Sequence, residues 1–250
     1  MSLIKITDLH KSFNSQIVLQ GINLEIKEGE SLAIIGQSGC GKSVFLKSIT
    51  RLLKPDRGDV YFGAKNLNEL SSSELIKIRR EIGMVFQSAA LFDSLSVKDN
   101  VGLGLRESRL FKADEIERIV EEKLNLVGLA DAADKSPSEL SGGMRKRVGL
   151  ARAIASNPKV LLYDEPTTGL DPVTADLINE LIVDLNKKLN VTSLTVTHDM
   201  TSAYKIASRI IMLYNGCIEF DGSPDEIKKC KNEVVQQFIN GKSRGPIKVR

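Results

Sequence analysis

A glycine-rich segment between an apolar run and a helix-like stretch constrains this chain more than any other feature. It follows the pattern G-x-x-x-x-G-K-[ST] and consists of Gly36, Gln37, Ser38, Gly39, Cys40, Gly41, Lys42 and Ser43. Residues 32–35 before it predict a buried strand, and residues 43–53 after it predict a helix. Backbone N–H groups converge where such a strand enters a helix, so the segment is expected to cradle phosphate. A glycine-rich turn without a ligand is the alternative, and the strand-loop-helix context disfavours it.

Two side chains of this loop carry the expected chemistry. Lys42 is expected to reach the β- and γ-phosphates of a nucleotide, and the Ser43 hydroxyl is expected to ligate Mg²⁺. Cys40 lies inside the loop, where a helix N-terminus can lower a thiol pKa, although a small residue that simply fits is the favoured interpretation.

The bulk composition excludes several classes of protein. The chain has 250 residues, of which 42% are hydrophobic, so one large or two small domains can form a core. The net charge of +3 comes without a basic stripe, which argues against nucleic acid. Three cysteines at unrelated spacings suit a reducing compartment. No run approaches the ~20 apolar residues that cross a bilayer, so any channel would be supplied by other chains.

The order of the strand and helix signals predicts the fold class. Alternating apolar residues over the first ~30 positions indicate antiparallel strands. Later strands alternate with helices, which indicates a mostly parallel sheet covered on both faces. We therefore expect an α/β fold with an antiparallel β subdomain. The expected divisions are an ATPase core of residues 1–88 and 156–232, an inserted helical subdomain of residues 89–155, and a basic C-terminal tail of residues 233–250.

A long amphipathic helix is expected to open at Asp171 and Pro172. Its apolar face is expected to consist of Leu177, Ile178, Leu181, Ile182 and Leu185.

Two adjacent carboxylates follow the apolar run 160–163. Side chains alternate along a strand, so Asp164 and Glu165 are expected to point in different directions. Asp164 is the candidate for Mg²⁺, through water, and Glu165 is the candidate general base toward the attacking water. A solvated pair at a strand end is the alternative, which the phosphate loop in the same chain disfavours.

A second glycine-containing helix start lies at Leu140, Ser141, Gly142, Gly143 and Met144. Ser141 is a good N-cap, and two glycines at a helix start favour close approach of a ligand to the backbone. The chain thus has one phosphate loop with its pair of carboxylates, but two anion cradles, that is, glycine-containing helix starts that can bind an anion. We infer that the second cradle closes over an ATP molecule held by another copy, the alternative being an ordinary helix cap.

Taken in order, these motifs resemble those of the ATP-binding-cassette ATPases over nearly the whole chain. The order is the phosphate loop, Gln87, the Leu140–Gly143 segment, Asp164 and Glu165, the Gly169–Asp171 segment, and His198. The resemblance implies a RecA-like core of the P-loop NTPase type, a β subdomain and a helical signature subdomain. It also implies a head-to-tail homodimer that encloses two ATP molecules with Mg²⁺.

The resemblance also implies roles for individual residues. Gln87 would contact Mg²⁺ and water, His198 the γ-phosphate, and Phe13 the adenine, while the phosphate loop would contact ATP from Gly36 to Val44. Contacts to the ATP of the opposite subunit would come from Ser141, Gly142, Gly143 and Asp171. The expected catalytic residues are Glu165, His198 and Lys42, and the expected metal ligands are Ser43, Gln87 and Asp164.

Three segments narrow the resemblance to the ATPase subunits of Mla/Mkl-type phospholipid transporters. They are residues 87–95, residues 140–147, where Met144 replaces the common Gln, and residues 237–247. This resemblance implies phospholipid movement between bacterial envelope membranes, with a multi-span permease and a lipid-binding protein of the mammalian-cell-entry type. The chain would sit peripherally on the cytoplasmic face of the inner membrane and would not contact lipid itself.

Other functions remain open at this point. One is a cassette that imports a small polar solute such as an amino acid, and another is a soluble cassette without a permease. A kinase or GTPase would leave Ser141, Gly142 and Gly143 unexplained. The basic tail could dock on the partner copy, which the resemblance favours, bind anionic headgroups, or stay solvated.

Overall fold

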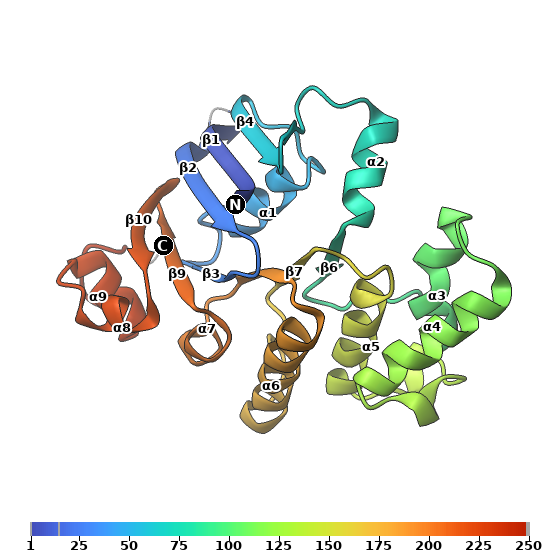
Figure 1. The fold of residues 1–250 in the computed structure, drawn as a ribbon. Coiled ribbons are helices and arrows are strands. Elements are labelled where there is room, and N and C mark those ends of the chain that lie inside the picture. The colour runs from blue at the N-terminus through green and yellow to red at the C-terminus, as the bar shows by residue number, and fades with distance from the viewer. Residues whose placement is uncertain (1, 15, 249–250) are drawn as a thin grey trace. The chain divides into compact units, whose positions relative to one another are not determined.

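The computed structural model describes residues 2–14 and 16–248 (Figure 1). They group into two compact units. The first unit holds the described residues up to Ile78 and from Thr192 onward, and the second unit holds residues Arg79–Val191. Among the described residues, no helix is both long and apolar enough to cross a membrane.

An antiparallel sheet forms one layer of the first unit. Its order is β2-β1-β4-β5, from β1 (Ser2–Phe13), β2 (Gln16–Lys27), β4 (Arg57–Phe62) and β5 (Lys65–Asn66). Apolar side chains alternate with polar ones along β1, and Ile4 and Ile6 are buried opposite Ile26 and Leu24 of β2. Figure 1 shows β1, β2 and β4 side by side. The antiparallel strands predicted near the N-terminus are therefore confirmed.

A second layer of the first unit contains parallel strands. Its order is β10-β9-β3-β8, from β3 (Ser31–Ile35), β8 (Thr192–Val196), β9 (Arg209–Tyr214) and β10 (Cys217–Gly222). Strand β3 runs parallel to both β8 and β9, and β10 is antiparallel to β9. The helices of this unit are α1 (Lys42–Ile49), α7 (Met200–Ile206), α8 (Pro224–Lys229) and α9 (Glu233–Ile239).

The C-terminal segment packs on its own chain. Val235 of α9 and Ile247 belong to the apolar cluster that includes Ile35 and Met212. The buried Gln237 amide donates to the Ile247 carbonyl oxygen at 3.0 Å and accepts from the Ile247 N–H at 2.7 Å. The described part of residues 233–250, expected as a tail, thus begins with a packed helix and folds back as far as Ile247. This described segment is not a solvated end, because apolar burial and three hydrogen bonds of the Gln237 amide hold it on the chain.

The second unit has a pair of parallel strands and a group of helices. The strands are β6 (Ile82–Val85) and β7 (Val160–Asp164). The helices are α3 (Val97–Ser108), α4 (Ala113–Leu126), α5 (Gly142–Ile154) and α6 (Pro172–Leu189), with short 3₁₀ turns at Ala130–Ala132 and Pro137–Glu139. Helix α2 (Ser72–Arg80) precedes β6.

Helices α3, α4 and α5 pack on one another within the range predicted to be helical. Every residue of 89–155 is described, and none of it is strand. The α/β class with parallel strands and an antiparallel layer is confirmed, while the limits proposed for the subdomains stay a prediction.

One face of α6 differs from expectation. Ile178, Ile182 and Leu185 are buried, but Leu177 is 61% exposed, as is Val173 at 74%. Residues 178, 182 and 185 follow the i, i+4, i+7 spacing of one helical face, and position 177 lies about 100° away from it. Leu177, predicted on the apolar face of this helix, therefore lies outside the part of that face that is buried.

Candidate functional site

The phosphate loop of the first unit connects the end of β3 to the start of α1. Gly36 and Gly41 have φ of 149° and 104°, in the region that favours glycine. A Cβ at Gly36 would lie 2.5 Å from the Leu213 carbonyl oxygen, and one at Gly41 would lie 2.9 Å from Val18. A Cβ at Gly39 would meet nothing within 4 Å. The loop is thus tightly packed at both ends and open in its middle, where a ligand can approach the backbone.

The Lys42 ammonium lies over this loop. Its side chain is only 6% exposed, and Nζ donates to the carbonyl oxygens of Gly36 at 2.7 Å and Gln37 at 2.9 Å. An ammonium has three N–H donors, so two carbonyl contacts leave a third for an anion. Together with the α1 N-terminus, this arrangement fits a polyphosphate.

Cys40 is not arranged as a reactive thiol. Burial raises its pKa, and the Lys42 ammonium opposes this effect only in part. The favoured interpretation from the sequence, a small residue that fits the loop, agrees with a thiol that stays protonated at neutral pH.

His198 follows β8 at the same sheet edge as the phosphate loop. The Thr197 N–H donates to the Ile34 carbonyl oxygen at 3.1 Å, so the ends of β3 and β8 are adjacent. His198 is exposed. The first unit therefore brings the loop and His198 together, as the parallel strands require.

Phe13 ends β1 and is 43% exposed. The Lys11 ammonium lies 5.4 Å from the centre of its ring. This exposure leaves the ring able to stack on a base, and its contact with adenine stays a prediction.

In the second unit, β6 and β7 end at a common edge. Val85 pairs with Tyr163, so Gln87 follows β6 close to the point where Asp164 ends β7 and Glu165 follows it. Glu165 has a left-handed φ of 51°, one residue beyond β7. The two carboxylates are therefore separated by a backbone turn, and not by strand alternation as the sequence suggested. The Thr168 hydroxyl donates to Glu165 Oε2 at 3.0 Å.

Helix α5 begins at the second cradle. The Ser141 hydroxyl accepts the Met144 N–H at 3.3 Å, as an N-cap does. A Cβ at Gly143 would lie 2.7 Å from Thr174 Cγ2, whereas a Cβ at Gly142 would meet only Leu170 at 3.4 Å. Packing within the chain therefore explains glycine at position 143 but not at position 142.

Asp171 caps helix α6. Its Oδ1 accepts the Val173 and Thr174 N–H groups, each at 3.0 Å. Hydrogen bonds from Thr174, first its side chain and then its backbone, lower the pKa of Asp171. The residue thus has a structural role in its own chain, and its contact with an opposite subunit stays a prediction.

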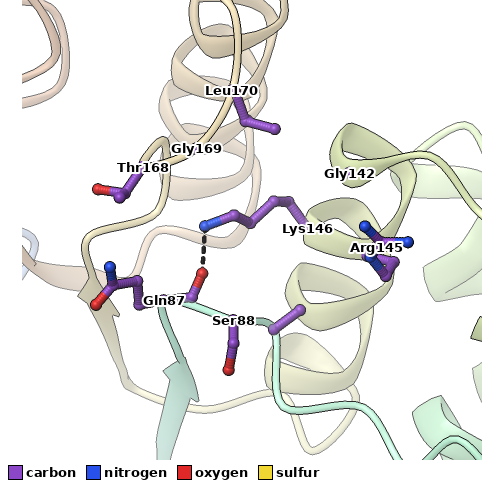
Figure 2. Close-up of a pocket in the computed structure, with 9 residues that line it drawn as sticks. Gln87, Ser88, Gly142, Arg145, Lys146, Thr168, Gly169 and Leu170 are labelled. Carbon is purple, nitrogen blue, oxygen red and sulfur yellow. Dashed lines mark hydrogen bonds between the residues drawn. The ribbon is translucent and has the colours of Figure 1, made fainter.

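A pocket of about 350 Å³ lies between the segment after β6, the start of α5 and the loop before α6 (Figure 2). Its lining consists of Gln87, Ser88, Ala89, Gly142, Arg145, Lys146, Thr168, Gly169 and Leu170. The Lys146 ammonium crosses it and donates to the Gln87 carbonyl oxygen at 2.5 Å and the Glu165 carbonyl oxygen at 3.3 Å.

Lys146 was not singled out from the sequence. The signal that could have found it is a lysine in line with Gly149, Leu150 and Ala153, which are all buried on α5.

The donor atoms expected to hold Mg²⁺ are the Ser43 hydroxyl, the Gln87 amide and the Asp164 carboxylate. Mg²⁺ prefers oxygen ligands and retains several waters, and these side chains offer oxygen. Among the described residues there is no group of three or more His, Cys, Asp or Glu that could hold a metal. The expected Mg²⁺ ligands do not form such a group, because they include only one carboxylate beside a hydroxyl and an amide.

Comparison with known proteins gives the family. The ABC transporter family model matches residues 19–168. The chain is 42% identical over 244 residues to the probable ribonucleotide transport ATP-binding protein mkl of Mycobacterium leprae, covering 98% of this chain and 70% of the relative. It is 38% identical over 249 residues to the intermembrane phospholipid transport system ATP-binding protein MlaF of Haemophilus influenzae, covering 100% of this chain and 94% of that one.

A solved structure supports the same assignment. The dimeric, post-hydrolysis state of the ATP-binding cassette MJ0796 bound to ADP and Pi matches with a TM-score of 0.80 and 38% identity, covering 88% of this chain and 98% of that one. The phosphate loop lies between a strand and a helix, the glycine-rich segment opens helix α5, and the paired carboxylates lie at the end of strand β7. These are the kinds of element that the sequence predicts for them. The chain belongs to the ATP-binding-cassette family and is an ATP-binding, ATP-hydrolysing transporter subunit.

Proposed function

We propose that this protein powers phospholipid transport between bacterial envelope membranes through a separate permease. The observation that carries the proposal is the match to a phospholipid transport ATPase over the full length of the chain, including its C-terminal segment. The relative named for ribonucleotide transport offers a different cargo for the same type of subunit. The cargo is therefore the point that an experiment must decide.

The proposed ATP contacts follow the sequence motifs residue by residue. Lys42 and the loop N–H groups hold the phosphates, while Ser43, Gln87 and Asp164 hold Mg²⁺, the last through water. Bound Mg²⁺ would neutralise charge that develops on the phosphate oxygens. The phosphate assignment is supported by the open centre of the loop and by the buried ammonium above it.

The chain's own side chains would then promote the attack of water. Glu165 accepts a proton from the water, and the Thr168 hydroxyl holds one oxygen of that carboxylate. His198 contacts the γ-phosphate, and Phe13 stacks on the adenine. The exposure of His198 and Phe13 is consistent with contact to a ligand.

The proposed assembly is a head-to-tail homodimer on a permease. Ser141, Gly142, Gly143 and Asp171 contact the ATP of the opposite subunit. The free space at Gly142 supports this assignment, because the chain itself leaves room there for a larger residue. The further partner is a lipid-binding protein of the mammalian-cell-entry type, and the subunit sits peripherally on the cytoplasmic face of the inner membrane.

The test is affinity isolation of the tagged chain from native membranes, with mass spectrometry of the proteins and lipids retained. We expect a multi-span permease, a lipid-binding protein of the mammalian-cell-entry type and bound glycerophospholipid. An untagged strain processed in parallel is the control. A permease retained with a solute-binding protein would indicate an importer of small solutes, and the absence of any membrane partner would indicate a soluble cassette.

A second measurement separates the two cargo classes. The isolated complex is assayed for ATP hydrolysis in detergent, in phospholipid vesicles, and with added ribonucleosides. Stimulation by phospholipid alone supports the proposal, and stimulation by ribonucleosides alone contradicts it.

A further inference from the structure

In the second unit, one buried lysine, Lys146, contacts both Gln87 and Glu165. Gln87 is expected to contact Mg²⁺, and Glu165 is expected to activate water. Lys146 is 6% exposed, although lysine is seldom buried unless its charge is compensated. Its Nζ contacts only main-chain acceptors among its described hydrogen bonds, the carbonyl oxygens of Gln87 and Glu165. A single side chain of α5 thus reaches the ends of both β6 and β7. Figure 2 shows the contact with Gln87.

The segment after β6 is held in a conformation that needs such support. Ala89 and Ala90 both have left-handed φ values, 60° and 47°, which cost free energy for a residue with a Cβ. Arg152, two turns further along α5, donates to the carbonyl oxygens of Ala89 at 2.6 Å and Ala90 at 2.7 Å. Residues 87–90 are therefore fastened to α5 by two cations.

The contact from Lys146 to Glu165 adds a second connection. Arg152 reaches only the segment 87–90, and Arg145, which also lines the pocket, donates to the Leu140 carbonyl oxygen at the start of its own helix. Only Lys146 among these cations connects α5 to the residue that follows β7. Burial lowers the pKa of Lys146, and the Glu165 carboxylate opposes this effect in part.

We propose that Lys146 is a positioning residue that couples the start of α5 to Gln87 and Glu165. When the glycine-rich start of α5 moves, the ammonium carries that movement to the two carbonyl groups next to the expected metal contact and general base. The alignment of the Glu165 carboxylate toward water then depends on the position of α5. This inference rests on the proposed roles of Gln87 and Glu165.

The variant Lys146→Met keeps the apolar stem and removes the three N–H donors. We expect kcat for ATP hydrolysis by the full-length chain to fall about 10-fold or more, with KM for ATP changed less than about 2-fold, since no contact to nucleotide is removed. Fluorescent-nucleotide titration should give an unchanged dissociation constant. Lys146→Arg should restore most of kcat, because a guanidinium can donate to both carbonyl groups.

The matched control is Lys123→Met. Lys123 is also a buried lysine of the second unit, 2% exposed, and its partners Glu122 and Asn157 lie outside the proposed site. We expect this variant to lower the thermal midpoint without changing kcat at 25 °C. A fall in kcat of equal size in both variants would show that Lys146 acts only on stability and would overturn the proposal.

Further outcomes decide the matter. The proposal fails if Lys146→Met keeps kcat within about 2-fold of the wild type, if KM rises as much as kcat falls, or if Lys146→Arg restores nothing. Lys146→Gln is made alongside, and if both neutral variants fail to fold, the residue is structural and the proposal is overturned. Failure of the proposed ATPase site itself would show separately, as normal turnover by Glu165→Gln.

Discussion

Glu165 stands just beyond β7 with a left-handed φ, and its carboxylate accepts the Thr168 hydroxyl at 3.0 Å. This left-handed residue changes the direction of the backbone directly after the strand, at the residue proposed as the general base. Sequence could predict that two carboxylates follow the strand, but not this turn, because a positive φ in a residue with a Cβ is held by contacts distant in sequence. Lys146, 19 residues earlier, supplies one such contact.

Glu165→Gln tests the general base. The amide keeps the size of the side chain but cannot accept a proton, so we expect kcat to fall by about 10²–10⁴ with nucleotide affinity retained. Phosphate release and fluorescent-nucleotide titration measure the two quantities. Turnover near the wild-type rate would remove Glu165 from this role.

The cysteines give a second test at this scale. Burial raises the pKa of Cys40, so at pH 7 to 8 its thiolate fraction is below that of an ordinary cysteine, while Cys217 is exposed. We expect a maleimide to label Cys217 first and Cys40 slowly, and ATP to slow Cys40 further. Peptide mass spectrometry resolves the sites, with Cys217→Ser as the control. Faster labelling of Cys40 would show that the loop activates its thiol.

At the scale of elements, local side chains mark where several helices begin. Ser71 with Glu74 caps α2, and Asp171 with Pro172 opens α6, because these side chains bond to N–H groups within the same turn. Ser136 and Glu139 form the same kind of capping box, but only a short 3₁₀ turn follows it. A capping box fixes where a helix begins but not how far it continues.

Contacts between distant segments could not be predicted in the same way. The left-handed pair at Ala89 and Ala90 depends on Arg152, which lies over 60 residues away. The pairing of Gln237 with Ile247 likewise needs the folded core as its surroundings. No short pattern in the sequence records either contact.

Helix α6 allows a pH prediction. The folded pKa of Asp171 lies below its ordinary value of 3.8, so its carboxylate stabilises the folded state above that pH and the contribution is lost as pH falls through the folded pKa. Asp171→Asn keeps a capping oxygen without the titration. We expect the free energy of unfolding of this variant to decrease less between about pH 5 and pH 3 than that of the wild type.

Urea unfolding at several pH values measures this difference. Asp171→Ala is the comparison, because it removes the cap and should lower stability at every pH. Identical slopes for wild type and Asp171→Asn would show that the carboxylate does not contribute to acid sensitivity.

At the scale of the whole molecule, the sequence motifs are distributed over both units. The first unit holds the phosphate loop and His198, and the second holds Gln87, Glu165 and the start of α5. The order of these motifs was predictable, because each is a contiguous stretch of sequence. The association of two copies around ATP is a property of the assembly and remains a proposal.

Gly142 provides the sharpest test of that assembly. A Cβ at this position meets only Leu170 at 3.4 Å, so the chain should fold with a larger residue there. In the Glu165→Gln background, we expect Gly142→Asp to abolish dimer formation with ATP, because its carboxylate would face the phosphates of the opposite subunit. Gly142→Ala should retain at least part of it.

Sedimentation velocity with and without ATP measures the dimer, and circular dichroism confirms that both variants are folded. Unchanged dimer formation by Gly142→Asp would contradict a site shared between subunits.

The Gln237 amide has a practical consequence for anyone who engineers this protein. Its oxygen and nitrogen are satisfied by the main chain of Ile247 and by Lys242, so a truncation at residue 241 strands a buried primary amide and uncovers the apolar cluster beneath it. Leaving such a group without partners costs about 1–3 kcal/mol. A fusion partner should therefore be joined beyond residue 248, since a shortened version would be expected to melt at a lower temperature in differential scanning calorimetry.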